Sequence, residues 1–298
     1  MALYAFDGTG NDDMADAAFD SNVVEFFNAY IDPQKNQDPD APRGSLYLKG
    51  IGTRARTRFG RWLSEAIGFG GHDRVGQALQ RLQRNVDAGD TTIDVIGFSR
   101  GAALAVSFAN AVCRKHERLS IRFIGIWDLV GQFGVPGRRI NAGHDLTCPS
   151  NATSCYHAMA LDERRLLFPL TRLGGTGNPA GSRLVEAWFR GVHSDVGGGN
   201  GNAGLNWISL NWMFENARRE GLPLDPAAIV ANLLHRGIAQ QISDHKVEIG
   251  PAREILAIDL VHTSVRIEPG LPGRPHNNPP DGLARIDDLG TITGAAVV

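Results

Sequence analysis

Short apolar runs alternate along this chain with longer segments in which apolar residues recur every three or four positions. Runs of the first kind are typical of buried strands, and the second spacing is typical of helices with one apolar face. Strands are predicted over residues 3–6, 45–49, 93–98, 121–127 and 185–189. Because strand-like and helix-like segments take turns, the sequence predicts an α/β fold, with a mostly parallel sheet and helices on both of its faces.

The helical segments carry their own signals. Asn22 precedes an apolar stripe and predicts a capped helix. A second stripe runs from Val75 to Val86, and a third amphipathic helix is expected over residues 207–217. The chain after about Gly221 shows weaker patterns, with one or two strands predicted in residues 255–265.

The segment Gly97-Phe98-Ser99-Arg100-Gly101 is the most informative in the chain. It follows a β-branched run and leads at once into an Ala- and Leu-rich helical pattern, the setting in which G-x-S-x-G marks a nucleophile elbow. The turn strains the serine backbone, and the flanking glycines leave room for strand and helix to pass each other. The sequence therefore predicts an exposed nucleophilic hydroxyl. The ordinary alternative is a glycine-flanked serine in a strand-to-helix turn.

A serine nucleophile needs a base to take its proton and a carboxylate to orient that base. Asp128 directly follows the predicted strand 121–127, so we expect its carboxylate beside Ser99 at the carboxyl edge of the sheet. His193 follows strand 185–189 and enters a glycine-rich loop. The order Ser, Asp, His along the chain matches that of the α/β-hydrolases, so these three residues are the predicted triad.

Other acids remain open for the role of Asp128, whereas the other histidines fit the role of base less well. Asp128 could instead cap a helix, and the alternative acids are Asp145, Asp162 and Asp195. His72 precedes the serine and is out of order, and the presumed insertion contains His144 and His157. The remaining histidines have no comparable setting: His116, His235, His245, His262 and His276.

Backbone N–H donors are needed to stabilise the oxyanion of a tetrahedral intermediate. Arg100, at the N-terminus of the predicted helix, is expected to supply one of them. The second is expected from the loop after the first strand, where Gly8 or Thr9 is the best candidate. Asp7 is expected to organise this turn through side-chain hydrogen bonds.

The same loop also has features of phosphotransfer enzymes and of metal sites. A strand followed by Asp-Gly-Thr also occurs in phosphotransfer enzymes that use an Asp-x-Asp pair, but here the first position of the pair is Ala5. Asp7, Asp12 and Asp13 could bind a divalent cation, yet acidic loop residues are ordinarily solvated. We therefore expect no metal and no cofactor.

Residues 131–183 are predicted to form a lid or insertion. The stretch is rich in leucine and contains Arg164, Arg165 and Arg172. An amphipathic, basic segment over a lipase-like site could contact anionic lipid. The more ordinary interpretation is a helix packed on the core with its arginines in solvent, and both interpretations also apply to the arginines within residues 54–61.

Composition narrows the class of protein. The 298 residues carry a formal net charge of -2, and 42% of them are hydrophobic, which is typical of a soluble globular chain. A single domain over residues 1–298 is expected, and near-neutral charge gives no reason to expect nucleic-acid binding. No apolar run approaches the roughly 20 residues that span a bilayer, and no secretory signal is visible. We expect a soluble protein, cytoplasmic in the producing cell.

Three cysteines are too few for a disulfide framework. Cys148 and Cys155 flank a short polar loop. They could close a small ring in an oxidising compartment or remain reduced thiols, and the sequence leaves both states open.

Several segments together resemble a known family. In chain order they are Phe6-Asp7-Gly8-Thr9, Gly97-Phe98-Ser99-Arg100-Gly101-Ala102, Trp127-Asp128-Leu129-Val130, Ala160-Leu161-Asp162-Glu163-Arg164 and Gly191-Val192-His193-Ser194-Asp195-Val196-Gly197-Gly198. This combination is similar to the DUF2235-type α/β-hydrolase domain family, which includes phospholipase effectors delivered by bacterial type VI secretion systems. The resemblance runs from about residue 3 to residue 215.

The resemblance implies an α/β-hydrolase fold, the triad Ser99, Asp128 and His193, and hydrolysis of carboxylic esters with phospholipids as the substrate class. The expected partners are an ester or phospholipid substrate, a transiently contacted membrane surface, and a secretion-apparatus component or an immunity protein. Export would follow a signal-independent, type VI-like route. The alternatives are a small-molecule esterase, an acyltransferase or peptidase with the same triad, and an inactive hydrolase-fold binding protein.

Overall fold

The computed structural model describes residues 1–8, 20–50, 62–116, 118–131, 145–174, 183–201, 204–235, 242–243, 250–265 and 277–294, with only the backbone for residues 62–72 and 235. Within these ranges, nine strands form one sheet in the order β2-β1-β3-β4-β5-β6-β7-β8-β9. Every neighbouring pair is parallel except β8 and β9, which are antiparallel. The predicted α/β class with a mostly parallel sheet is therefore confirmed.

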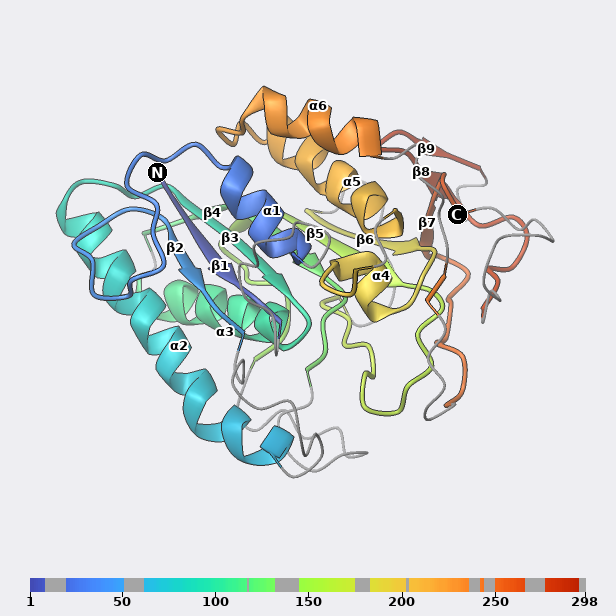
Figure 1. Cartoon of the computed structure of the whole chain (residues 1–298), viewed down its shortest axis with the longest axis horizontal. Coiled ribbons are helices and arrows are strands. Elements are labelled where there is room, and N and C mark those ends of the chain that lie inside the picture. Colours follow the sequence, from blue (N-terminus) through green and yellow to red (C-terminus); the bar gives the residue numbers. More distant parts are fainter. Residues whose placement is uncertain are drawn as a thin grey trace.

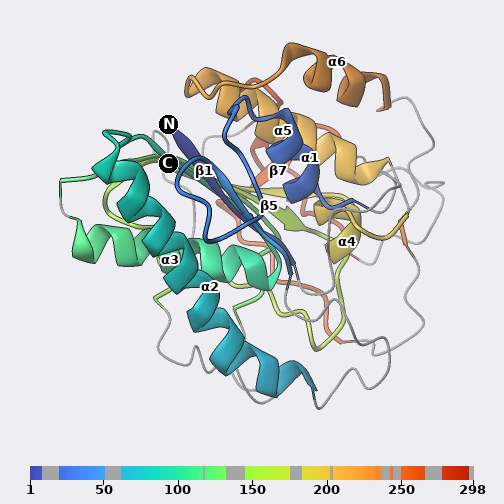
Figure 2. The same ribbon diagram turned by 60° about the vertical axis from the view of Figure 1, so that its left-hand side comes forward.

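The strands are β1 (Ala2–Phe6), β2 (Leu46–Leu48), β3 (Ile93–Phe98), β4 (Ile121–Trp127), β5 (Ala152–Ala160), β6 (Leu184–Phe189), β7 (Leu260–His262), β8 (Arg285–Ile286) and β9 (Ile292–Thr293). The helices are α1 (Asn22–Ala29), α2 (Trp62–Asp87), α3 (Arg100–Lys115), α4 (His193–Gly197), α5 (Leu205–Arg219) and α6 (Pro226–His235). Figures 1 and 2 show α2 and α3 on one face of the sheet and α1, α4, α5 and α6 on the other. Helices on both faces are thus as predicted.

The two faces have separate apolar cores, and β1 contributes to both. Leu3 and Ala5 pack in the core that contains α1 and α5, whereas Tyr4 and Phe6 pack in the core that contains α3. All residues of this strand are buried. Side chains that alternate between two covered faces explain why the strand is almost continuously apolar in sequence.

The cap of α1 differs by one residue from the prediction. Ser21 is the N-cap, and its hydroxyl accepts a hydrogen bond from the Val24 N–H. Asn22 is the first helical residue, and its side chain instead donates to the carbonyl oxygens of Val196 and Asn206 at 2.9 and 3.1 Å. The residue predicted as the cap therefore joins α1 to α4 and α5.

The prediction that residues 131–183 form a lid or insertion is wrong for the middle of this range. Residues 152–160 form β5, which pairs with β4 on one side and with β6 on the other. The sequence of this strand contains serine, threonine, cysteine and histidine instead of a β-branched run, so it lacks the apolar signal of the other central strands. Of the remainder, residues 132–144 and 175–182 lie outside the described residues.

Cys148 and Cys155 are free thiols in this structure. Cys155 is buried on β5, and Cys148 is only partly buried. The interaction between the two neighbouring thiols lowers the pKa of Cys148 and raises the pKa of Cys155. The reduced alternative left open by the sequence is the one present here.

The C-terminal part adds the three short strands β7, β8 and β9 to one edge of the sheet. Of the strands predicted within residues 255–265, the structure contains β7.

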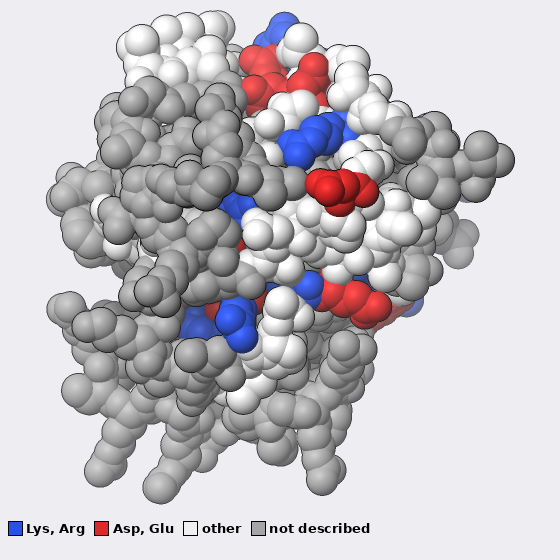
Figure 3. All heavy atoms as spheres, turned by 90° about the vertical axis from the view of Figure 1, so that its right-hand side faces the viewer, with Lys and Arg blue, Asp and Glu red and all other residues white. Residues whose placement is uncertain are grey.

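On the face shown in Figure 3, the described basic and acidic side chains are interspersed and do not gather by sign. No helix among the described residues is long and apolar enough to cross a membrane.

Candidate active site

The predicted catalytic residues all follow the carboxyl ends of parallel strands. The strand order reverses between β1 and β3, since β2 lies on one side of β1 and the later strands lie on the other. In an open α/β sheet, such a switch point leaves a crevice at the carboxyl edge, where ligands bind. Ser99 follows β3, Asp128 follows β4, and His193 follows β6.

Ser99 occupies a strained turn between β3 and α3. Its φ and ψ are 59° and -125°, a region that residues other than glycine rarely adopt. The Ser99 N–H donates to the Trp127 carbonyl at 3.1 Å, which ties the turn to the end of β4. A Cβ at Gly97 would lie 2.8 Å from the Cα of Ala102, and one at Gly101 would overlap the carbonyl oxygens of Phe6 and Asp7. Both glycines are thus required for the turn, as the sequence predicts.

Asp128 is the second strained residue. Among the described residues other than glycine, only Ser99 and Asp128 have a positive φ, which is 40° at Asp128. Its carboxylate accepts the Ala160 N–H at 2.8 Å and lies 2.6 Å from His193 Nδ1. Burial would raise the pKa of Asp128, but Arg253 and His193 outweigh burial and hold that pKa well below its usual range. The carboxylate is therefore ionised and fixed in orientation.

His193 is the first residue of α4 and is 4% exposed. Because Nδ1 faces the ionised Asp128 at 2.6 Å, it carries the proton and leaves Nε2 as the acceptor. The imidazole packs between the rings of Phe98 and Phe168, with centroid distances of 4.6 and 4.8 Å. Burial lowers the pKa of His193 below its ordinary value, although Asp128 and Glu163 act to raise it.

Contact between Phe98 and His193 brings the histidine next to the residue that precedes Ser99. Within the described residues, no hydrogen bond joins the Ser99 hydroxyl to the imidazole. Catalytic hydrogen bonds of this kind are often long in ligand-free enzymes and tighten when substrate binds. The predicted pairing of Asp128 with His193 is present, and the role of Ser99 stays a prediction.

The loop after β1 is organised by Asp7, as the sequence predicts. One carboxylate oxygen accepts the Gly8 N–H at 2.6 Å, and the other accepts the hydroxyls of Ser21 and Tyr47, each at 2.7 Å. The Gly8 N–H is thus already engaged by a carboxylate, which contradicts its prediction as an oxyanion donor. Thr9 lies outside the described residues, as do Asp12 and Asp13.

The alternative acids have other partners. Asp162 accepts from Arg190 at 2.8 Å and from the Gly191 N–H at 2.7 Å. Asp195 accepts the Val192 N–H at 3.1 Å within the short α4 turn. Asp145 is exposed and accepts hydrogen bonds from Thr147. Asp162 and Asp195 thus bind backbone N–H groups just before His193 and shape the loop that carries it.

His157 lies on β5 and supports the acid loop. Its Nδ1 donates to Glu186 at 2.9 Å, and its Nε2 accepts the Leu129 N–H at 3.2 Å. Arg172 pairs with the same glutamate at 3.1 Å. Because Leu129 directly follows Asp128, this buried network fixes the backbone turn that presents the Asp128 carboxylate.

Three residues at the site were missed in the sequence. Glu163 is 1% exposed and accepts the His193 backbone N–H at 3.1 Å, and Arg165 lowers its pKa to about 2 against the effect of burial. Phe168 covers the imidazole, and the guanidinium of Arg165 stacks on its ring at 3.8 Å. Arg253 contacts Asp128 directly. Glu163 lies within a segment that carries the family resemblance, whereas Arg253 lies in no recognisable motif.

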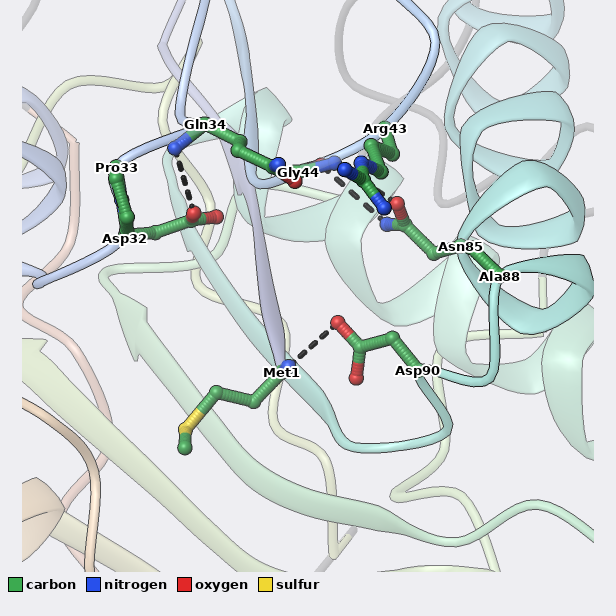
Figure 4. A pocket seen from close by; sticks show the side chains of 9 residues that line it. All are labelled: Met1, Asp32, Pro33, Gln34, Arg43, Gly44, Asn85, Ala88 and Asp90. Carbon is green, nitrogen blue, oxygen red and sulfur yellow. Dashed lines mark hydrogen bonds and ion pairs between the residues drawn. The ribbon is translucent and has the colours of Figure 1, made fainter.

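A pocket of about 220 Å³ lies elsewhere in the molecule (Figure 4). Its lining includes Met1, Asp32, Asn85 and Asp90, and the Met1 amino group pairs with Asp90 at 2.5 Å. Met1 precedes β1 and Asp90 precedes β3, so the pocket lies at the amino edge of the sheet. It is therefore separate from the carboxyl edge of the sheet, where Ser99 lies.

Comparison with known proteins gives one family. The model described as the type VI secretion (T6SS) phospholipase effector Tle1-like catalytic domain matches residues 3–114 and 107–216. No curated protein matches the chain significantly.

Two solved structures are similar. A crystal structure of an uncharacterized protein from Pseudomonas aeruginosa is 22% identical, with a TM-score of 0.51 over 78% of this chain and 48% of that chain. The structure of the Tle1 effector bound to the VgrG spike from the type 6 secretion system is 23% identical, with a TM-score of 0.45 over 66% of this chain and 50% of that chain. The chain thus spans about half the length of these two structures.

Proposed function

Because this chain belongs to the family of Tle1-like phospholipase effector catalytic domains of type VI secretion, we propose that it is a serine ester hydrolase acting through Ser99, Asp128 and His193. The observation that carries the proposal is the 2.6 Å contact between Asp128 and His193 at the same sheet edge as the strained Ser99. An ionised carboxylate, an oriented imidazole and a serine on an elbow turn are the parts that acyl transfer needs.

In the proposed mechanism, the Ser99 oxygen attacks the ester carbonyl while His193 Nε2 takes the hydroxyl proton. Asp128 stabilises the imidazolium that forms. The Arg100 N–H is the first of α3 and has no partner within the helix, so it can donate to the oxyanion, with Thr9 as the predicted second donor. His193 then protonates the departing alcohol, and a water molecule activated by the same imidazole releases the acid from Ser99.

We further propose phospholipids as the substrate class. The family model describes phospholipase effectors, and the Arg100 side chain suits a phosphodiester beside the scissile ester. Burial lowers the pKa of Arg100 to about 10, and no carboxylate within the described residues pairs with it. A half-buried guanidinium without a carboxylate partner favours an anionic ligand group. A secretion-apparatus partner and type VI-like export are proposed on the family membership alone.

Product analysis on vesicles tests the substrate class. We expect the purified protein to release free fatty acid and lysophospholipid from phosphatidylglycerol or phosphatidylethanolamine vesicles, whereas a Ser99→Ala preparation leaves the lipids intact. Turnover of short p-nitrophenyl esters without lipid release would favour a small-molecule esterase. Absence of turnover on lipids, esters and peptides by folded protein would favour an inactive binding protein and contradict the proposal.

A further inference from the structure

Arg253 makes a two-point contact with the acid of the proposed triad. Its Nη1 donates to Asp128 Oδ1 at 2.6 Å, and its Nη2 donates to Oδ2 at 3.0 Å. The arginine side chain is 8% exposed and the aspartate is fully buried. Arg253 lies outside residues 3–114 and 107–216, which the family model matches. A buried, forked pair of this kind fixes both oxygens of a carboxylate in one plane.

The same guanidinium also holds the segments around His193. Nη1 donates to the Ala160 carbonyl at 2.7 Å, and Nη2 donates to the Phe168 carbonyl at 2.9 Å. Phe168 in turn packs its ring against the imidazole of His193. The Asn277 side chain donates to the Arg253 carbonyl at 2.8 Å, which anchors the arginine from the C-terminal part of the chain. One side chain thus joins the acid, the end of β5 and the ring that covers the base.

The positive charge of Arg253 also affects the protonation of His193. Asp128 faces two cations when His193 is protonated, namely the imidazolium and Arg253. His193 faces the carboxylates of Asp128 and Glu163, and the cation of Arg165. Because Arg253 neutralises part of the charge on Asp128, less of that charge stabilises a proton on His193. The arginine therefore keeps the base neutral, and able to accept a proton, at lower pH.

We propose that Arg253 is a positioning residue of the hydrolytic site, which orients the Asp128 carboxylate, holds Phe168 over His193 and sets the pH range of the base. This inference rests on the proposed hydrolase function. It assigns a task in the active site to the segment that begins at residue 250, beyond the residues matched by the family.

The test compares Arg253→Gln and Arg253→Lys with the control Arg164→Gln. Arg164 also donates to the C-terminal segment, through its Nε to the Gly250 carbonyl at 3.0 Å, but is not among the residues that bond Asp128. We measure kcat and KM on a soluble ester across pH, with thermal unfolding as the check on folding. For the wild type, the acid limb of kcat/KM should lie below the ordinary histidine pKa of 6.5, since the base must be neutral.

Arg253→Gln should reduce kcat about 10- to 100-fold with KM nearly unchanged, because the acid and base lose their fixed geometry. Its acid limb should move to higher pH, since Asp128 then acts on His193 without a competing cation. Arg253→Lys should keep the acid limb close to that of the wild type but lose part of kcat, because an ammonium cannot bind both oxygens in one plane. Arg164→Gln should behave as the wild type.

Rescue with added guanidinium ion distinguishes a positioning role of Arg253 from a role in folding alone. Guanidinium ion added to Arg253→Ala, at a concentration that leaves the wild type unaffected, should restore part of kcat and move the acid limb back. A folded Arg253→Gln protein with the wild-type acid limb, or an Arg253→Ala protein that guanidinium does not rescue, would overturn the inference. Full activity in Ser99→Ala would overturn the proposed function instead, so the two failures are distinguishable.

Discussion

Replacing Ser99 by alanine is expected to lower kcat for ester hydrolysis roughly ten-thousandfold to a millionfold, because the nucleophile is lost. The residual rate should come from the oxyanion site and substrate binding alone. The structure explains why this position is special: Ser99 lies at φ 59° between two glycines whose replacement would clash with neighbouring backbone.

The matched control for Ser99→Ala is Ser107→Ala, since Ser107 lies further along the same helix, away from the sheet edge. It should retain kcat and KM. Both variants should unfold near the wild-type temperature, because alanine and serine differ little in size. Ester turnover by Ser99→Ala at more than a few per cent of the wild-type rate would assign the nucleophile to another residue.

Asp128→Asn is expected to lose about four orders of magnitude in kcat at neutral pH. An amide can present its NH₂ group to His193 Nδ1, which favours the tautomer that keeps the proton on Nε2, where the proton of Ser99 must be received. The neutral amide also fails to stabilise the imidazolium that forms during attack. Stopped-flow or burst kinetics with an activated ester would show the acylation step slowed to the same degree.

The same substitution should also destabilise the fold. Arg253 would be left beside a neutral amide in a site where its side chain is 8% exposed. Loss of one partner of a buried ion pair costs roughly 3–5 kcal/mol in the free energy of unfolding. The double variant Asp128→Asn/Arg253→Met, which removes both charges, should recover part of that stability in urea unfolding while remaining inactive. An Asp128→Asn protein as stable as the wild type would contradict the buried pair.

The residues of the proposed triad were all predicted from local signals in the sequence. Ser99 follows a β-branched strand and precedes a helix, and the spacing of its glycines reports the strain directly. Asp128 was predicted as the acid because it directly follows the strand after that of Ser99, and the structure pairs these two strands in parallel, which places both residues at one edge of the sheet. His193 was predicted as the base from its order in the chain and from the glycine-rich segment that follows it.

Other features depend on contacts that no local pattern encodes. β5 was hidden because its buried polar residues are satisfied by distant partners, as His157 is by Glu186 and Leu129. Arg253 reaches Asp128 from far along the chain, and its own neighbours carry no motif. The Gly8 N–H looked available in sequence, but the carboxylate of the preceding residue binds it. In each case, tertiary hydrogen bonding or a competing short-range acceptor decided the outcome.

Labelling with a fluorophosphonate probe, followed by peptide mapping, tests the central claim most directly, because such probes react only with serines activated by a neighbouring base. We expect one labelled peptide, modified at Ser99, with labelling absent in Ser99→Ala and strongly slowed in His193→Gln. Labelling at a different serine, or equal labelling of the wild type and His193→Gln, would contradict the proposed triad.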